Sequence, residues 1–231
     1  MSIASLACQT CPVRDTAACS ALAEDDRAVV AAMGRHREFR RGETVMAAGD
    51  DNLACATLVS GALKVTRIDA EGNEQILSVI HPAGFVGEMF APVAHHDIVA
   101  LTDSILCVFS RPSYEQAVAR YPELAQALLR RSSEELLEAR TLLDLKGRRS
   151  AEAKVAGLIL AFAKSASSSS CHSANAFELP LSRAEMASVL GLTIETVSRQ
   201  MTRLERRGLI SRKGARGLSL RDAPGLERLA S

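Results

Sequence analysis

The chain has 231 residues, of which 47% are hydrophobic, 28 are Lys or Arg and 27 are Asp or Glu, with six cysteines and no tryptophan. This length is enough for about two domains of ordinary size, each with its own core. The longest apolar runs are too short to span a membrane, and residues 1–10 lack the pattern of an export signal, so we expect a cytoplasmic protein with no membrane contact.

The charges are unevenly divided along the chain. Residues 1–145 carry 13 Lys and Arg against 20 Asp and Glu, whereas residues 146–221 carry 14 against 5. A segment this basic has the charge needed to neutralise phosphates, and the acidic segment before it needs another role. The near-neutral total therefore hides two domains with two functions, and it does not exclude nucleic-acid binding.

Residues 1–21 contain Cys8, Cys11 and Cys19 and show little hydrophobic periodicity, so we treat them as a cysteine-rich segment that needs a ligand to become ordered. In a cytoplasmic chain, cysteines favour metal or cluster ligation, redox sensing or packing over disulfides. The spacing Cys-x2-Cys-x7-Cys suits zinc or an iron–sulfur cluster that needs one more ligand, and it does not distinguish the two. The candidates for the fourth ligand are Cys55, Cys107 and Cys171.

Residues 22–112 are expected to form a sensor domain rich in strands. Short apolar runs alternate with single glycines from about residue 37 to 110, which is typical of a β-sandwich or barrel. The candidate strands are residues 58–59, 63–68, 76–80 and 98–109.

Residues 113–145 follow with few helix breakers, and Pro122 is their only early interruption, so we predict one long helix there. Leu129, Leu136 and Leu143 recur every seven residues and form a narrow seam of the kind that two helices share. We therefore predict a dimerisation helix. The alternative is a helix that packs only on its own domain.

Residues 146–231 contain the signals of a helix-turn-helix. After a helix over residues 151–164 and a serine-rich surface loop over 165–176, Ser182 and Glu185 form a capping box for a second helix. Gly191 suits a left-handed helix end, and Thr193 can cap a third helix that runs to about Arg207. Residues 209–220 then read as a hairpin wing with a basic tip.

The third helix divides into two faces. Its apolar stripe is formed by Ile194, Val197, Met201 and Leu204. The residues expected to contact DNA lie on the other side: Glu195, Ser198, Arg199 and Arg203. The first three lie near the helix start, where a recognition helix meets base edges, whereas Arg203, with Arg206 and Arg207, suits phosphates.

The order Glu195, Ser198 and Arg199 resembles the Glu-x-x-Ser-Arg pattern in the recognition helix of the Crp/Fnr family. In relatives with this pattern the arginine pairs with guanine, and the glutamate and serine read neighbouring bases. The resemblance implies a homodimer on double-stranded DNA, bound to a palindromic operator similar to TTGAT-N4-ATCAA. It also implies the fold: α+β, with an N-terminal cyclic-nucleotide-binding-like β-roll, a long dimerisation helix and a C-terminal winged helix-turn-helix.

A resemblance to FNR-type, oxygen-responsive regulators extends along nearly the whole chain. In that group three N-terminal cysteines and one at the end of the β-roll hold a [4Fe-4S] cluster, which implies Cys8, Cys11, Cys19 and Cys107 as metal ligands here. The prototype has a shorter gap between its second and third ligands, and the seven-residue gap here resembles the FnrL/FnrN branch. The resemblance implies a transcription regulator that responds to oxygen or nitric oxide and works with RNA polymerase.

Two alternatives stay open. A regulator of the same fold could bind zinc or work without a cluster. The β-roll could bind a cyclic nucleotide, because Gly87 and Glu88 resemble part of such a pocket; however, no Lys or Arg lies between Arg67 and Arg111 to neutralise the cyclic phosphate, so we expect no cyclic nucleotide. No catalytic motif emerges, and we do not expect an enzyme.

Overall fold

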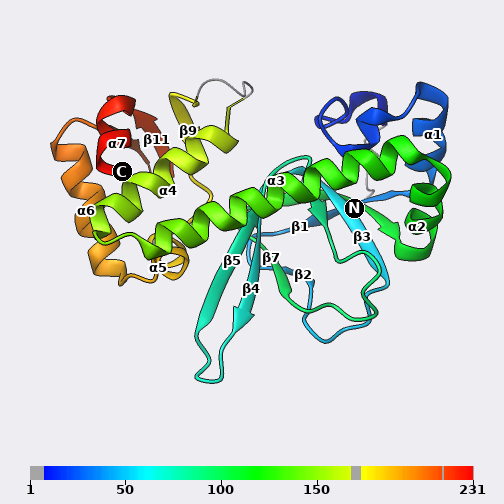
Figure 1. The fold of residues 1–231 in the computed structure, drawn as a ribbon, viewed down its shortest axis with the longest axis horizontal. Coiled ribbons are helices and arrows are strands. Elements are labelled where there is room, and N and C mark those ends of the chain that lie inside the picture. Colours follow the sequence, from blue (N-terminus) through cyan, green and yellow to red (C-terminus); the bar gives the residue numbers. More distant parts are fainter. Residues whose placement is uncertain (1–7, 168–172, 215, 231) are drawn as a thin grey trace. The chain divides into compact units, whose positions relative to one another are not determined.

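The computed structural model describes residues 8–167, 173–214 and 216–230 (Figure 1). The chain divides into two compact units. Unit 1 comprises Met1–Arg67 and Ser78–Leu137, and unit 2 comprises Ile68–Leu77 and Glu138–Ser231. Among the described residues, no helix is both long and apolar enough to cross a lipid bilayer.

Unit 1 starts with two short 3-10 turns, η1 (Cys8–Thr10) and η2 (Ala18–Ala21), and helix α1 (Glu24–Met33). The strands that follow are β1 (Arg35–Phe39), β2 (Thr44–Met46), β3 (Ala54–Ser60), β4 (Leu63–Ile68), β5 (Glu74–Ile80), β6 (Phe85–Val86), β7 (Asp97–Ala100) and β8 (Ser104–Ser110). The ends of β4 and β5 that flank their shared turn belong to unit 2.

These strands form two four-stranded sheets, in the orders β1-β8-β3-β6 and β2-β7-β4-β5. Apolar side chains from both sheets form one core, which includes Leu58, Leu63, Ile98 and Leu106. The predicted β-roll is therefore confirmed. The candidate strand over residues 98–109 is divided into β7 and β8, because the chain turns at Leu101, whose N–H donates to the Ala62 carbonyl at 2.8 Å.

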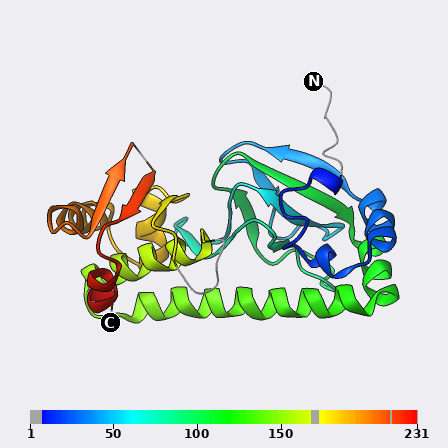
Figure 2. The same ribbon diagram turned by 90° about the horizontal axis from the view of Figure 1, so that it is seen from above.

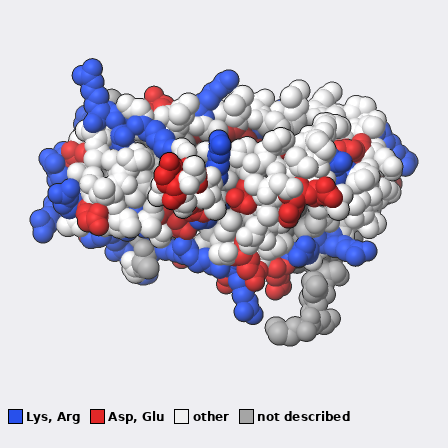
Figure 3. Space-filling view, turned by 90° about the horizontal axis from the view of Figure 1, so that it is seen from below, with Lys and Arg blue, Asp and Glu red and all other residues white. Residues whose placement is uncertain are grey.

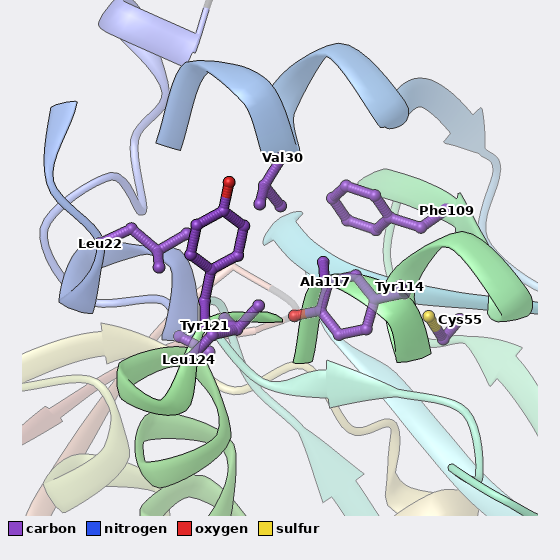
Figure 4. Packing of buried hydrophobic residues seen from close by; sticks show 9 residues of the cluster. Leu22, Val30, Cys55, Phe109, Tyr114, Ala117, Tyr121 and Leu124 are labelled. Atoms are coloured by element: carbon purple, nitrogen blue, oxygen red, sulfur yellow. The ribbon is translucent and has the colours of Figure 1, made fainter. Parts of the chain in front are cut away.

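A second core attaches helices to the β-roll. Val30 of α1 packs with Phe109 of β8 and with Tyr114, Tyr121 and Leu124 (Figure 4). The rings of Phe109 and Tyr114 lie 4.9 Å apart between centroids, within the range of a favourable aromatic pair. Helix α1, which the sequence analysis did not identify, is thus held by the end of the roll.

The prediction of one helix over residues 113–145 is wrong. The structure has α2 (Arg111–Arg120) and α3 (Pro122–Gly147), and Tyr121 between them has φ −118° and ψ 93°, outside the helical region. The cause is Pro122, whose ring excludes helical backbone at the preceding residue. Proline is tolerated at the start of α3 because the first turn of a helix needs no N–H donor there.

Unit 2 contains the last part of α3, then α4 (Ala151–Ser165), β9 (Ala176–Glu178), α5 (Arg183–Leu190), α6 (Ile194–Arg206), β10 (Ile210–Lys213), β11 (Gly217–Leu220) and α7 (Ala223–Ala230). The strands pair in the order β10-β11-β9. Helix α4 packs against α6 and α7 (Figures 1 and 2). Strand β9 and helix α7 were not predicted, and part of the serine-rich loop, residues 168–172, lies outside the described residues.

Candidate nucleic-acid interface and cysteine site

The predicted caps of the helix-turn-helix are confirmed. The Ser182 hydroxyl accepts the Glu185 N–H at 3.2 Å, and the Ser182 N–H donates to the Glu185 carboxylate at 2.6 Å. Gly191 ends α5 with φ 62°, the left-handed conformation that glycine adopts without steric cost. Thr193 caps α6 by accepting the Thr196 N–H at 3.2 Å. These local signals set where each helix begins and ends.

Helix α6 has one buried face. Val197, Met201 and Leu204 are each 0% exposed. Ile194, which the sequence analysis places on the same stripe, is 48% exposed, so that assignment is wrong. Ile194 is the first residue of α6 and lies almost one turn before the buried Val197.

The other face of α6 carries the residues expected to contact DNA: Glu195, Ser198, Arg199 and Arg203. Arg199 Nη2 donates to Thr196 Oγ1 at 3.3 Å, and that oxygen lies 3.0 Å from Thr193 Oγ1. The guanidinium is therefore held near the start of α6, the end that meets base edges in helix-turn-helix proteins.

The carboxylate of Glu195 stays ionised. Hydrogen bonds from its own backbone N–H and from the Thr193 hydroxyl lower its pKa, and the charge of Arg199 acts in the same direction. A carboxylate accepts hydrogen bonds only, which suits the amino group that cytosine presents in the major groove.

Basic side chains surround this face. An open hollow beside α6 is lined by Ser198, Arg199, Thr202, Arg203, Arg206 and Arg207. Figure 3 shows Lys and Arg side chains gathered on the surface of unit 2. Such a surface can bind phosphates, which position a protein on DNA without reading its sequence.

The predicted hairpin wing is confirmed as β10 and β11. Arg212 joins it to the end of α6, because its backbone N–H and Nε donate to the Glu205 carboxylate at 3.1 and 2.9 Å. Strand β9 extends the wing to three strands through the pair of Phe177 and Leu218. Ala215, in the predicted basic tip, lies outside the described residues.

The N-terminal cysteine segment packs on the β-roll. The Cys11 N–H donates to the Cys8 carbonyl at 3.3 Å, and the Leu22 N–H donates to the Cys19 carbonyl at 3.2 Å. Cys11, Cys19 and Cys107 all contact one small apolar cluster, formed by Val13, Ala17, Val59 and Ala83. The fold therefore brings predicted ligands from the N-terminal segment and from β8 to one place.

The pKa shifts of these thiols show the same grouping. Burial, followed by the charges of Cys19, Cys11 and Cys8, raises the pKa of Cys107 to about 12. Burial and the charges of Cys8 and Cys11 also raise the pKa of Cys19, and Arg27 opposes this effect. Cys107 and Cys19 therefore both lie close enough to Cys8 and Cys11 to feel their charges.

Three arginines hold this segment by donating to its backbone carbonyls. The pairs are Arg14 to Cys8 at 3.3 Å, Arg27 to Ser20 at 3.1 Å and to Leu22 at 2.9 Å, and Arg131 of α3 to Thr16. The sequence analysis missed these residues, because no spacing or motif links an arginine on α3 to a loop at the N-terminus.

The thiols fit an iron–sulfur cluster by their chemistry. Cys8, Cys11, Cys19 and Cys107 are free, and four thiolates are the usual ligand set of a [4Fe-4S] cluster. Within the described residues, no group of three or more His, Cys, Asp or Glu side chains is already arranged to hold a metal ion.

Of the other two candidate ligands, the structure describes only Cys55. Cys55 on β3 is 2% exposed and belongs to the core beside Phe109 and Tyr114 (Figure 4). Burial, with smaller contributions from Glu115 and Cys107, raises the pKa of Cys55 to about 12, so this thiol packs as a protonated side chain. Cys171 lies outside the described residues.

Glu88, in the part of the roll that resembles a cyclic-nucleotide pocket, is engaged by histidines. Its carboxylate contacts His95 Nδ1 and lies 3.1 Å from His96 Nδ1. Burial acts to raise the pKa of Glu88, but the hydrogen bonds from His95 and His96 outweigh it and lower the pKa. This carboxylate already has partners within the protein.

Helix α3 presents an apolar row to solvent. Leu129, Leu136 and Leu143 are 69%, 50% and 69% exposed. Large apolar side chains exposed in a row are typical of an interface between helices. Elsewhere on α3, the Glu135 carboxylate accepts the Phe85 N–H at 3.1 Å and so attaches the helix to the roll.

Comparison with known proteins places this arrangement in a family. A Crp-like helix-turn-helix domain matches residues 124–229, and a cyclic nucleotide-binding domain matches residues 36–121. The chain is 34% identical over 218 residues to the transcriptional activator protein FnrL of Cereibacter sphaeroides, covering 93% of this chain and 88% of the relative. It is 31% identical over 224 residues to the nitrogen fixation regulation protein FixK of Bradyrhizobium diazoefficiens, covering 97% and 94%.

Solved structures share the fold. The structure of FixK2 from Bradyrhizobium japonicum matches with a TM-score of 0.76 at 26% identity, covering 86% of this chain and 98% of that chain. The structure of a CooA mutant from Carboxydothermus hydrogenoformans has a TM-score of 0.71 at 18% identity, covering 88% and 90%, which is a likeness of fold alone. The chain therefore belongs to the Crp/Fnr family of DNA-binding transcription regulators and is similar to FnrL and FixK.

Proposed function

We propose that this regulator responds to oxygen through a [4Fe-4S] cluster held by Cys8, Cys11, Cys19 and Cys107. The observation that carries the proposal is the apolar cluster that Cys107 of the β-roll shares with Cys11 and Cys19. The free thiols and the similarity to FnrL support it. When bound, the cluster supplies an iron–sulfur centre that oxygen can oxidise.

The chain's own residues connect this site to α3. Arg131 of α3 donates to the Thr16 carbonyl, in the loop between Cys11 and Cys19. Because ligation by cysteines orders the segment that carries them, its binding free energy adds to the folding free energy of this junction. The position of the cysteine segment is thereby coupled to a contact on the helix that carries the leucine seam.

Dimerisation through Leu129, Leu136 and Leu143 would then set operator occupancy. A dimer places two recognition helices about one DNA turn apart, which matches the two halves of a TTGAT-N4-ATCAA-like palindrome. A signal that changes the dimer population changes DNA binding by mass action. RNA polymerase is the expected partner of the bound dimer.

The test measures iron, zinc and acid-labile sulfide per chain on anaerobically purified protein, with visible absorption and operator binding followed before and after air is admitted. We expect about four iron and four sulfide per chain, with colour and DNA affinity lost in air. Zinc or no metal, with DNA binding unchanged by air, would reject the oxygen sensor and leave a Crp/Fnr regulator that works without a cluster.

A further inference from the structure

Two arginines on the basic side of α6 share one carboxylate within unit 2. Glu152, in the first turn of α4, receives Arg207 Nη1 on its Oε1 oxygen at 2.6 Å and Arg203 Nε on the same oxygen at 3.5 Å. The Glu152 side chain is 17% exposed, whereas those of Arg203 and Arg207 are 61% and 45% exposed. A mostly buried acid therefore neutralises part of the surface that is expected to face DNA.

The paired arginines line the hollow that also contains Arg199 and Arg206. Arg206 forms no ion pair with any residue that the structure describes. Arg199 bonds to the Thr196 hydroxyl and not to Glu152. The pairing with Glu152 thus affects two of the four arginines in the hollow and leaves the expected base-reading arginine unaffected.

A carboxylate and a phosphate both present anionic oxygens to a guanidinium. Contacts of lysine and arginine to phosphates supply essentially all of the affinity for DNA of unrelated sequence. DNA must therefore displace Glu152 before Arg203 and Arg207 gain full phosphate contacts. DNA of unrelated sequence can bind in many registers, and in many of these an arginine released from Glu152 can contact a phosphate. The operator binds in one register only, which its base contacts fix.

We propose that Glu152 is a specificity-determining residue that competes with DNA phosphates for Arg203 and Arg207. This competition weakens binding to unrelated DNA more than it weakens binding to the operator. The proposal rests on the DNA binding of the family and holds with or without a cluster in the N-terminal segment.

The test compares Glu152→Gln, which removes the charge and keeps the shape, with Glu178→Gln as a matched control. Glu178 is an exposed acid on β9, so its substitution changes the net charge equally. Fluorescence anisotropy on an operator duplex and on a scrambled duplex is measured over a series of salt concentrations. For Glu152→Gln we expect affinity for the scrambled duplex to rise about 3- to 10-fold at low salt and affinity for the operator to rise less than about threefold. The slope of log affinity against log salt concentration should steepen by about one to two per subunit.

Three results would overturn the proposal. Weaker binding of Glu152→Gln to both duplexes would show that Glu152 positions the arginines for phosphate contact. Equal effects of Glu152→Gln and Glu178→Gln would reflect net charge alone. The third is an effect of Glu152→Gln that persists when Arg203 and Arg207 are both replaced by glutamine, because that background has no ion pair to break. This comparison stays informative even where single variants lower the urea midpoint of unfolding.

Discussion

Arg199 is held by Thr196, which lies less than one helical turn before it. The pKa of Cys107, in contrast, is raised partly by thiols that lie far away in the sequence. The first arrangement follows from helix geometry, because residues three apart are neighbours on a helix surface. The second exists only because Cys107 of β8 packs against the same apolar cluster as the N-terminal segment. Single substitutions can test the two sites separately.

Replacing Arg199 by alanine should weaken operator binding by about 1 to 3 kcal/mol and relax the preference at one base pair, because the bidentate contact to guanine expected of Arg199 would be lost. Binding to operators with each base pair substituted in turn measures this. Arg206→Ala is the control, and it should weaken binding to all of these duplexes equally. A uniform loss for Arg199→Ala as well would make Arg199 a phosphate contact.

Replacing Cys107 by serine should abolish iron retention, because the proposed cluster would lose its ligand from the β-roll. The matched variant Cys55→Ser should keep its iron, although a hydroxyl buried in the core beside Tyr114 costs about 1 to 3 kcal/mol of unfolding free energy. Iron per chain after anaerobic purification, with urea unfolding as the stability check, measures both. Equal iron in the wild type and in Cys107→Ser would overturn the ligand assignment.

Helix α3 has a different role on each of its faces. Glu135 accepts the Phe85 N–H of the roll, and Arg131 donates to the Thr16 carbonyl of the cysteine segment. Leu129, Leu136 and Leu143 are exposed in the single chain. The helix therefore carries both the contact to the proposed sensor and the seam through which a second subunit is expected to bind.

Replacing Leu136 by lysine should raise the dissociation constant of the dimer at least about tenfold, because a charge would be buried in the seam. The unfolding free energy of the monomer should change by less than about 0.5 kcal/mol, because this side chain is 50% exposed. Sedimentation measures the first and urea unfolding the second. Leu137→Lys makes the same change at a leucine that is 61% exposed and outside the seven-residue repeat, and an equal effect there would argue against the seam.

The division of charge seen in the sequence is a property of the whole chain. The basic residues after position 145 belong to the unit that carries the helix-turn-helix, and the acidic majority precedes them. The stability of the chain also depends on pH, because partial burial lowers the pKa of His81 to about 4 and keeps this histidine neutral.

In the unfolded chain His81 titrates near pH 6.5, whereas its pKa in the folded state is about 4, so the unfolded state binds more protons between these two pH values. The contribution of neutral His81 to the unfolding free energy is fully present above about pH 6.5. It is lost as the pH falls toward 4, which lowers the unfolding free energy by about 1 to 3 kcal/mol. Urea unfolding of the wild type and of His81→Gln at a series of pH values measures this. The variant should lose less stability on acidification, and parallel curves would contradict the shift.

The helix-turn-helix was predictable almost residue by residue. Three features mark its helix ends: the capping box at Ser182, the left-handed end at Gly191 and the cap at Thr193. Each depends on contacts within about four residues of chain, so it can be predicted from the local sequence. The break before Pro122 has an equally local cause, and the prediction of one helix there failed because the proline ring excludes helical backbone at Tyr121.

By itself, the sequence determined the strand-rich first domain and the helix caps and wing of the helix-turn-helix, because short-range backbone preferences and hydrophobic periodicity encode them. Only the tertiary structure decided that Cys107 and not Cys55 shares the apolar cluster with Cys11 and Cys19. It alone also decided that Arg131 holds the cysteine segment and that Glu152 holds Arg203 and Arg207. The physical reason is that these contacts join residues from separate elements, and no local rule specifies which side chains meet when sheets and helices pack.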